Sequence, residues 1–167
     1  MTDLVKFVDD LVPEVKLEPG SVFYWSPKKR LITYRADLIN EPTGQWALLH
    51  EAAHAVMNHT TYSSDIGLLK LEVEAWDKAK TIAEEIGLEI DEEHIQDCLD
   101  TYRDWLHGRS TCPNCAIICM QASPTSYKCH NCNTSWTVSS SRFCRPYRLT
   151  IKDNKEKRLR PKTATFS

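Results

Sequence analysis

The fold of this chain is decided by residues 46–59, which read WALLHEAAHAVMNH. Their apolar and polar residues alternate with a helical period, and Thr43 stands where an N-cap is expected, so we predict a helix from about Thr43 to His59. Histidines at positions i and i+4 lie one turn apart on the same helix face, so His50 and His54 can hold one Zn²⁺ between them. Glu51 is rotated about 100° from His50 around the helix axis. We therefore predict a metal site in which Glu51 acts as general base toward a zinc-activated water.

A catalytic zinc needs a third protein ligand and one open position, and Glu72, Glu74 and His59 are the candidates. A second helix is expected at about 68–86, closed by Gly87. Glu72 lies within its apolar stripe, whereas Glu74 lies on its polar face. A carboxylate in a core-facing stripe is costly unless it is paired or binds a metal, so we predict Glu72 as the ligand. His59 follows His54 by five residues, and we expect it to be a solvated histidine at the helix end.

These residues carry a family resemblance. An H-E-x-x-H motif followed by E-x-x-A on the next helix, here residues 72–75, resembles the gluzincin zinc metallopeptidases, and it is most similar to the ImmA/IrrE type and the minigluzincin type. The resemblance covers residues 20–105. It implies an α+β fold in which a small β-hairpin or sheet packs on a zincin-like helical core. It also implies that His50, His54 and Glu72 are ligands and that Glu51 is the general base.

The sequence departs from this family at Trp76, where many members have an acid or an amide. The outer partner of a zinc-binding histidine is therefore unassigned. The family also uses a Tyr or His to stabilise the oxyanion, and Tyr62, His59 and Tyr102 all remain open for that role.

A second metal site is predicted from the cysteines, of which the chain has seven. Two C-x-x-C pairs are separated by thirteen residues, and each pair can form a tight knuckle that presents two thiolates. Two such knuckles make a closed tetrahedral zinc site, typical of a zinc ribbon, whose role is structural. Its predicted ligands are Cys112, Cys115, Cys129 and Cys132. A protease core followed by a zinc ribbon also resembles the SprT-like arrangement, although no third histidine is suitably placed. The expected cofactors are thus two Zn²⁺, one catalytic and one structural.

We expect three parts: a gluzincin-like metallopeptidase domain at 1–108, a zinc ribbon at 109–147 and a basic, flexible tail at 148–167. The whole chain has a net charge of −2, but residues 63–104 carry thirteen acidic and four basic residues. Residues 148–162 carry seven basic and two acidic residues, which makes nucleic acid a weak partner hypothesis for the ribbon and tail. No apolar run approaches the length of a membrane span, and the acidic start is unlike a signal peptide, so we expect a cytoplasmic protein.

The function predicted from these patterns is a zinc-dependent metallopeptidase, a hydrolase that cleaves peptide bonds of a protein or peptide substrate. An extended substrate is expected to pair with the edge strand of a hairpin formed by residues 21–35, with 31–35 as the candidate strand. The alternative is a nucleic-acid-binding or regulatory zinc-ribbon protein in which the zincin-like site is structural or idle. The substrate, its cleavage preference and the oligomeric state do not follow from the sequence.

Overall fold

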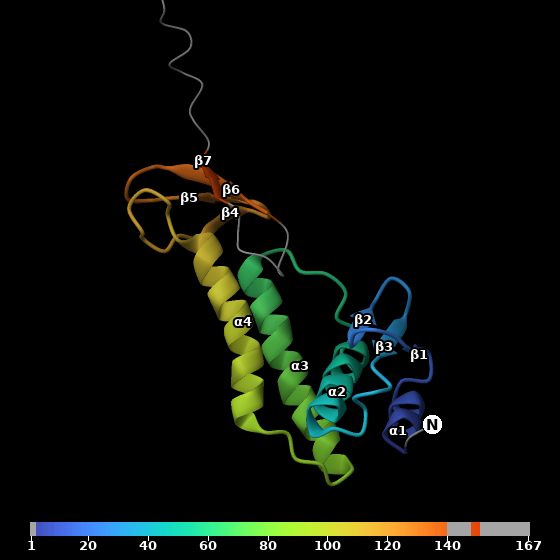
Figure 1. Ribbon diagram of the computed structural model, residues 1–167. Coiled ribbons are helices and arrows are strands. Elements are labelled where there is room, and N and C mark those ends of the chain that lie inside the picture. Colours follow the sequence, from blue (N-terminus) through green and yellow to red (C-terminus); the bar gives the residue numbers. More distant parts are fainter. Residues whose placement is uncertain (1–2, 140–147, 151–167) are drawn as a thin grey trace, which may run out of the picture. The chain divides into compact units, whose positions relative to one another are not determined.

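The computed structural model describes residues 3–139 and 148–150. The chain divides into two compact units, Met1–Asp104 and Trp105–Ser167, and the boundary falls within a helix (Figure 1). Helices and small sheets both occur in the described residues, and a four-stranded antiparallel sheet with four cysteines beside it forms the C-terminal unit. The predicted α+β fold class is therefore confirmed.

Helices supply most of the first unit. The described helices are α1 (Asp3–Leu11), α2 (Pro42–Val56), α3 (Asp65–Glu85) and α4 (Glu92–Ser110). Helices α2 and α3 pack against each other, and small residues on the faces that carry His50 and Glu72, among them Ala53, Ala75 and Ala79, are fully buried. Small side chains let two helix axes approach closely, so longer residues beside them can meet across the interface. None of the described helices combines the length and apolar character needed to cross a membrane.

The helix ends follow local rules, with one difference from expectation. Ser64 caps α3, because its Oγ accepts a hydrogen bond from the Gly67 N–H at 3.1 Å. Gly87 follows α3 with φ +70°, a conformation that glycine adopts without steric penalty. The expected cap at Thr43 is wrong: α2 begins at Pro42, whose missing N–H costs nothing in the first turn, and Glu41 is the N-cap residue without a side-chain bond.

A three-stranded sheet accompanies the helices of the first unit. Its strands are β1 (Lys16–Pro19), β2 (Tyr24–Ser26) and β3 (Leu31–Tyr34), in the order β1-β3-β2. Strands β2 and β3 form the predicted antiparallel hairpin. Strand β1 was not predicted and pairs with β3 in parallel, so the expectation that residues 31–35 form an edge strand is wrong. The edge strand of the hairpin is β2.

The second unit is built on strands β4 (Gln121–Ser123), β5 (Ser126–Lys128), β6 (Ser135–Val138) and β7 (Arg148–Thr150), paired antiparallel in that order. Its small core stacks Tyr127 on Trp136, with ring centroids 5.5 Å apart. The indole Nε1–H of Trp136 donates to the carbonyl of Arg109 at 2.9 Å. Residues 148–150, the first three of the predicted tail, form β7. The rest of that tail, 151–167, lies outside the described residues.

The capping contact at α3 gives a prediction for stability. Replacing Ser64 with Ala removes the only side-chain acceptor seen for the Gly67 N–H in the described part of the chain, and should lower the free energy of unfolding by about 1 kcal/mol. Thr43→Ala is the matched control and should change it by less than about 0.5 kcal/mol, because exposed Thr43 caps nothing. Urea unfolding of both variants measures the difference, and equal losses would contradict the assignment.

Candidate metal centres

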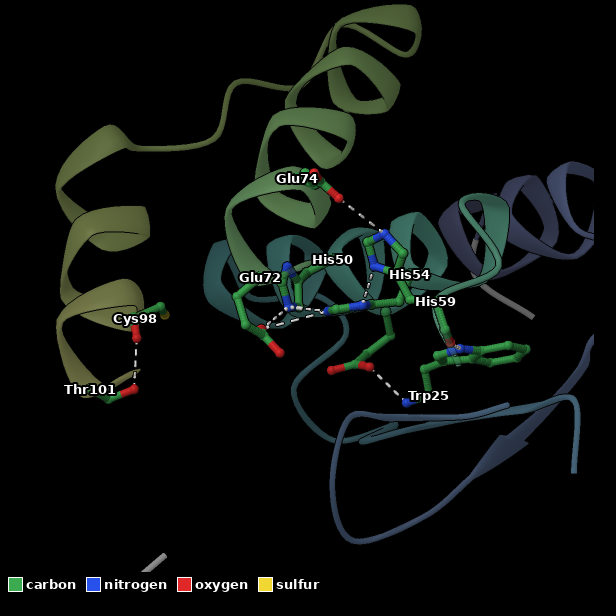
Figure 2. Close-up of polar contacts among 9 residues, drawn as sticks. Trp25, His50, His54, His59, Glu72, Glu74, Cys98 and Thr101 are labelled. Atoms are coloured by element: carbon green, nitrogen blue, oxygen red, sulfur yellow. Dashed lines mark hydrogen bonds and ion pairs between the residues drawn. The ribbon is translucent and has the colours of Figure 1, made fainter. Parts of the chain in front are cut away.

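The first candidate centre lies where α2 and α3 face each other (Figure 2). His50 and His54 project from α2, and Glu72 projects from α3 toward both rings. The His50 Nε2 lies 3.2 Å from the Glu72 Oε2 and 3.1 Å from the His54 Nε2. The remaining pair, His54 Nε2 and Glu72 Oε2, is 3.6 Å apart. The structure thus brings the three predicted ligands together.

The donor set fits a tetrahedral metal ion. Bonds of about 2.1 Å from Zn²⁺ to nitrogen and oxygen place two donor atoms of a tetrahedron about 3.4 Å apart. The three separations here, 3.1, 3.2 and 3.6 Å, lie around that value. Hydrogen bonds alone serve this cluster poorly, because a single proton on the His50 Nε2 cannot point at both Glu72 and His54. A cation between the three atoms would satisfy all of them.

Burial distinguishes Glu72 from its neighbour Glu74. The Glu72 side chain is 8% exposed, whereas that of Glu74 is 54% exposed. Burial acts to raise the pKa of the Glu72 carboxyl, but hydrogen bonds and charges from His50 and His54 outweigh it, so that this pKa is lowered overall. Glu72 is therefore an anion facing two imidazoles, as a metal ligand should be.

Glu51 lies apart from the three converging atoms and has a main-chain partner. Its Oε2 accepts a hydrogen bond of 2.7 Å from the backbone N–H of Trp25 in β2. Strand β2 is at the sheet edge, so this N–H points away from β3 and toward α2. The contact ties the predicted general base to the edge strand.

His59 is not the solvated histidine that we expected: its side chain is 9% exposed. Helix α2 ends at Val56, and Asn58 adopts φ +53°. The His59 N–H then bonds to the His54 carbonyl at 2.9 Å, and the Asn58 N–H bonds to the Ala55 carbonyl at 3.0 Å, which together form a Schellman motif. This turn brings the His59 ring back beside His54, with 2.9 Å between their Nδ1 atoms. An Asn two residues beyond the helix is the sequence signal for such a turn.

The surroundings of His59 also bear on its other predicted role. Its Nδ1 is bound to the Nδ1 of His54, and its Nε2 lies 3.7 Å from the Glu74 Oε2. Burial, followed by the charge of His54, lowers the pKa of His59, which favours the neutral ring. His59 thus lies on the Nδ1 side of His54, away from the other two predicted ligands. This position argues against an oxyanion role for His59 and leaves Tyr62 and Tyr102 open.

His50, the other predicted ligand on α2, has a different environment from His54. Its ring stacks on Trp76, with centroids 4.2 Å apart and planes 28° from parallel. Its buried Nδ1 has no hydrogen-bond partner among the described residues. The family resemblance places an acid or amide at position 76, and in this chain an indole occupies that place. Packing against Trp76 therefore positions the His50 ring.

The second candidate centre contains the four predicted cysteines. Cys112 and Cys115 come from the first knuckle, and Cys129 and Cys132 from the second, with all four sulfurs within 4.8 Å of one another. The Sγ atoms of Cys112 and Cys132 are 3.6 Å apart, and those of Cys115 and Cys129 are 3.5 Å apart. Zn–S bonds of about 2.3 Å in a tetrahedron give about 3.8 Å. The arrangement fits a closed metal site made entirely of sulfur.

Ionisation of these thiols is uneven. A hydrogen bond with the Thr134 hydroxyl lowers the pKa of Cys132 to about 5, and burial raises the pKa of Cys112 to about 11. Four adjacent thiolates repel one another, so full ionisation of the set requires a cation between them.

Comparison with protein-family models, with curated protein sequences and with solved structures found no match.

The two centres lead to a prediction for metal content. Fully loaded protein should bind two zinc ions per chain, and a mild chelator should remove the ion of the three-ligand centre first, because four thiolates hold zinc more tightly than two imidazoles and a carboxylate. Elemental analysis after stepwise chelation measures this. A single zinc in folded protein loaded with excess metal would contradict it.

Individual ligands can be tested in the same assay. Glu72→Gln should weaken zinc binding at the three-ligand centre strongly and leave the cysteine centre loaded, because an amide oxygen carries no charge. Glu85→Gln, on the exposed face of α3, is the matched control and should bind two ions. If both variants retain two ions with unchanged affinity, Glu72 is not a ligand.

Proposed function

We propose that this chain is a zinc-dependent metallopeptidase. The observation that carries the proposal is the contrast between its two candidate centres. The cysteine centre offers four protein ligands, while His50, His54 and Glu72 offer three among the described residues. Four protein ligands fill the coordination shell of a zinc ion. Three leave one position for water or substrate, as catalytic sites require.

The residues around the three-ligand centre suit hydrolysis. A bound zinc ion would lower the pKa of a water molecule and polarise the scissile carbonyl. Glu51 would accept a proton from that water and deliver it to the leaving amine. A purely structural metal has no use for this carboxylate. Its bond to the Trp25 N–H holds it toward β2 while leaving one carboxylate oxygen outside that contact.

The substrate would be an extended peptide that pairs with β2. Strand β2 is an edge strand, and the N–H of Trp25 in this strand donates to Glu51. Peptides commonly bind by adding a strand to such an edge. Pairing there would place a peptide bond beside the general base, and exposed Tyr24 would offer an apolar contact to the substrate.

The alternative, a nucleic-acid-binding or regulatory ribbon protein, has weaker support. Between residues 105 and 139 the Lys and Arg side chains are Arg109, which is buried, and Lys128. Phosphate binding depends on clustered exposed cations. Residues 140–147, which carry Arg142 and Arg145, and the basic residues at 151–167 lie outside the described residues, so nucleic acid binding by the ribbon and tail remains a hypothesis.

Glu51→Gln tests the proposed reaction. The amide keeps the size of the side chain and can still accept from the Trp25 N–H, but it cannot take a proton. Peptide hydrolysis should therefore fall by about 100- to 10,000-fold while both zinc ions stay bound. Cleavage of a mixed library of quenched fluorescent peptides by zinc-loaded protein measures the rate.

Glu85→Gln is again the control and should cleave the library as the unmodified protein does. Equal hydrolysis by the Glu51→Gln protein would contradict the proposal, and so would a lack of hydrolysis in unmodified protein that carries both ions.

A further inference from the structure

We propose that His59 and Glu74 are positioning residues that fix the ring orientation and the tautomer of His54 as a metal ligand. This inference rests on the proposed function, because it concerns the same centre. It assigns the outer partner of a zinc histidine, which the family resemblance left without a candidate. In Figure 2 the three side chains form a row that starts at Glu74, passes through His59 and ends at His54.

The two nitrogens of His54 face opposite ways. Its Nε2 lies 3.1 Å from the His50 Nε2 and 3.6 Å from the Glu72 carboxylate, so it faces the centre. Its Nδ1 lies 2.9 Å from the Nδ1 of His59, on the side away from the centre. His59 continues outward, with its Nε2 3.7 Å from the Glu74 Oε2.

The proton positions in this row follow from the chemistry of a ligand histidine. A neutral imidazole that binds a metal through Nε2 carries its proton on Nδ1. The His54 Nδ1–H must then donate to the Nδ1 of His59, which accepts. A neutral His59 that accepts at Nδ1 has its own proton on Nε2, directed toward the Glu74 carboxylate. One set of tautomers thus satisfies each contact in the row.

The backbone holds His59 in place for this task. Its N–H donates to the His54 carbonyl within the Schellman turn, and its carbonyl accepts from the indole Nε1–H of Trp25 at 2.8 Å. These main-chain contacts fix the backbone of His59, and its side chain, which is 9% exposed, has little room to rotate. A ring so confined is a rigid acceptor for His54.

His50 provides the contrast within the same centre. Its ring lies against Trp76, and its Nδ1 has no hydrogen-bond partner in the described part of the chain. Of the two histidines, His54 is therefore the one that a polar side chain outside the centre holds in place. Outer partners of this kind typically change metal affinity or activity by about 10- to 100-fold.

Zinc affinity tests the role of His59 without reference to hydrolysis. His59→Phe keeps the ring but removes the acceptor, and it should weaken zinc binding at the three-ligand centre by about 10- to 100-fold. His59→Asn is the conservative variant, because its amide oxygen can occupy the place of Nδ1, and it should recover most of the affinity. Competition with a coloured chelator measures both, and zinc retained by the four cysteines reports on the fold of the second unit.

A space-filling role for His59 predicts the reverse order, since Phe fills the space better than Asn. Affinity of His59→Phe equal to that of the unmodified protein would overturn the proposal, and so would a loss in His59→Asn as large as that in His59→Phe. Glu74→Gln should weaken binding by less than His59→Phe does, because its side chain is 54% exposed, and Glu85→Gln should have no effect.

The tautomers can also be read in unmodified protein, which covers the case in which His59→Phe fails to fold. Nitrogen-15 NMR of the zinc-loaded chain should show His54 protonated at Nδ1 and His59 protonated at Nε2. Coordination of His54 through Nδ1, or a proton on the Nδ1 of His59, would overturn the proposal. Either result leaves the Glu51→Gln test of peptide hydrolysis unaffected, so the two proposals can fail separately.

Discussion

The packing of α2 on α3 is the constraint on which the rest of the first unit depends. The two helices lie close enough for the Glu72 carboxylate to reach His50 and His54. Burial of an unpaired carboxylate is costly, and the two imidazoles, or a cation shared with them, offset that cost. Glu74, two residues further along α3, lies on its exposed side, where its carboxylate is 3.7 Å from the His59 Nε2. The angular positions of the two glutamates on α3 therefore determine which of them faces the histidines.

The end of α2 matters as much as its length. A helix continued to position 59 would carry that histidine around to a different side, whereas the left-handed residue Asn58 turns the chain back. The turn places His59 against His54 and exposes its carbonyl to the Trp25 indole. Trp25 also donates its main-chain N–H to Glu51. One residue of β2 thus contacts both the proposed general base, Glu51, and the proposed partner of His54, His59.

Features that follow from the spacing of residues within one helix could be predicted from the sequence. Features that depend on pairing between segments distant in the sequence could not. Helical spacing placed His50 and His54 on one face, and the apolar stripe separated Glu72 from Glu74. The parallel pairing of β1 with β3 joins segments across the hairpin, and no local pattern records it. Because β1 was not predicted, residues 31–35 were wrongly expected to form an edge strand. The position of His59 depends on the left-handed backbone of Asn58. The predicted helix ran to His59, so it included Asn58 and gave no reason to expect a turn there.

The two candidate centres differ in what the surrounding chain can do without them. The first unit has a continuous apolar core that includes Leu48, Leu49 and Ile82, and burial of this core contributes free energy of folding without an ion. Among the described residues of the second unit, the apolar cluster around the cysteines consists of Tyr127, Trp136 and Val138. A core of that size rarely sustains a fold alone, and metal binding then supplies free energy of folding. A centre that is not needed for folding can give up a ligand position, and this freedom is what a catalytic zinc requires.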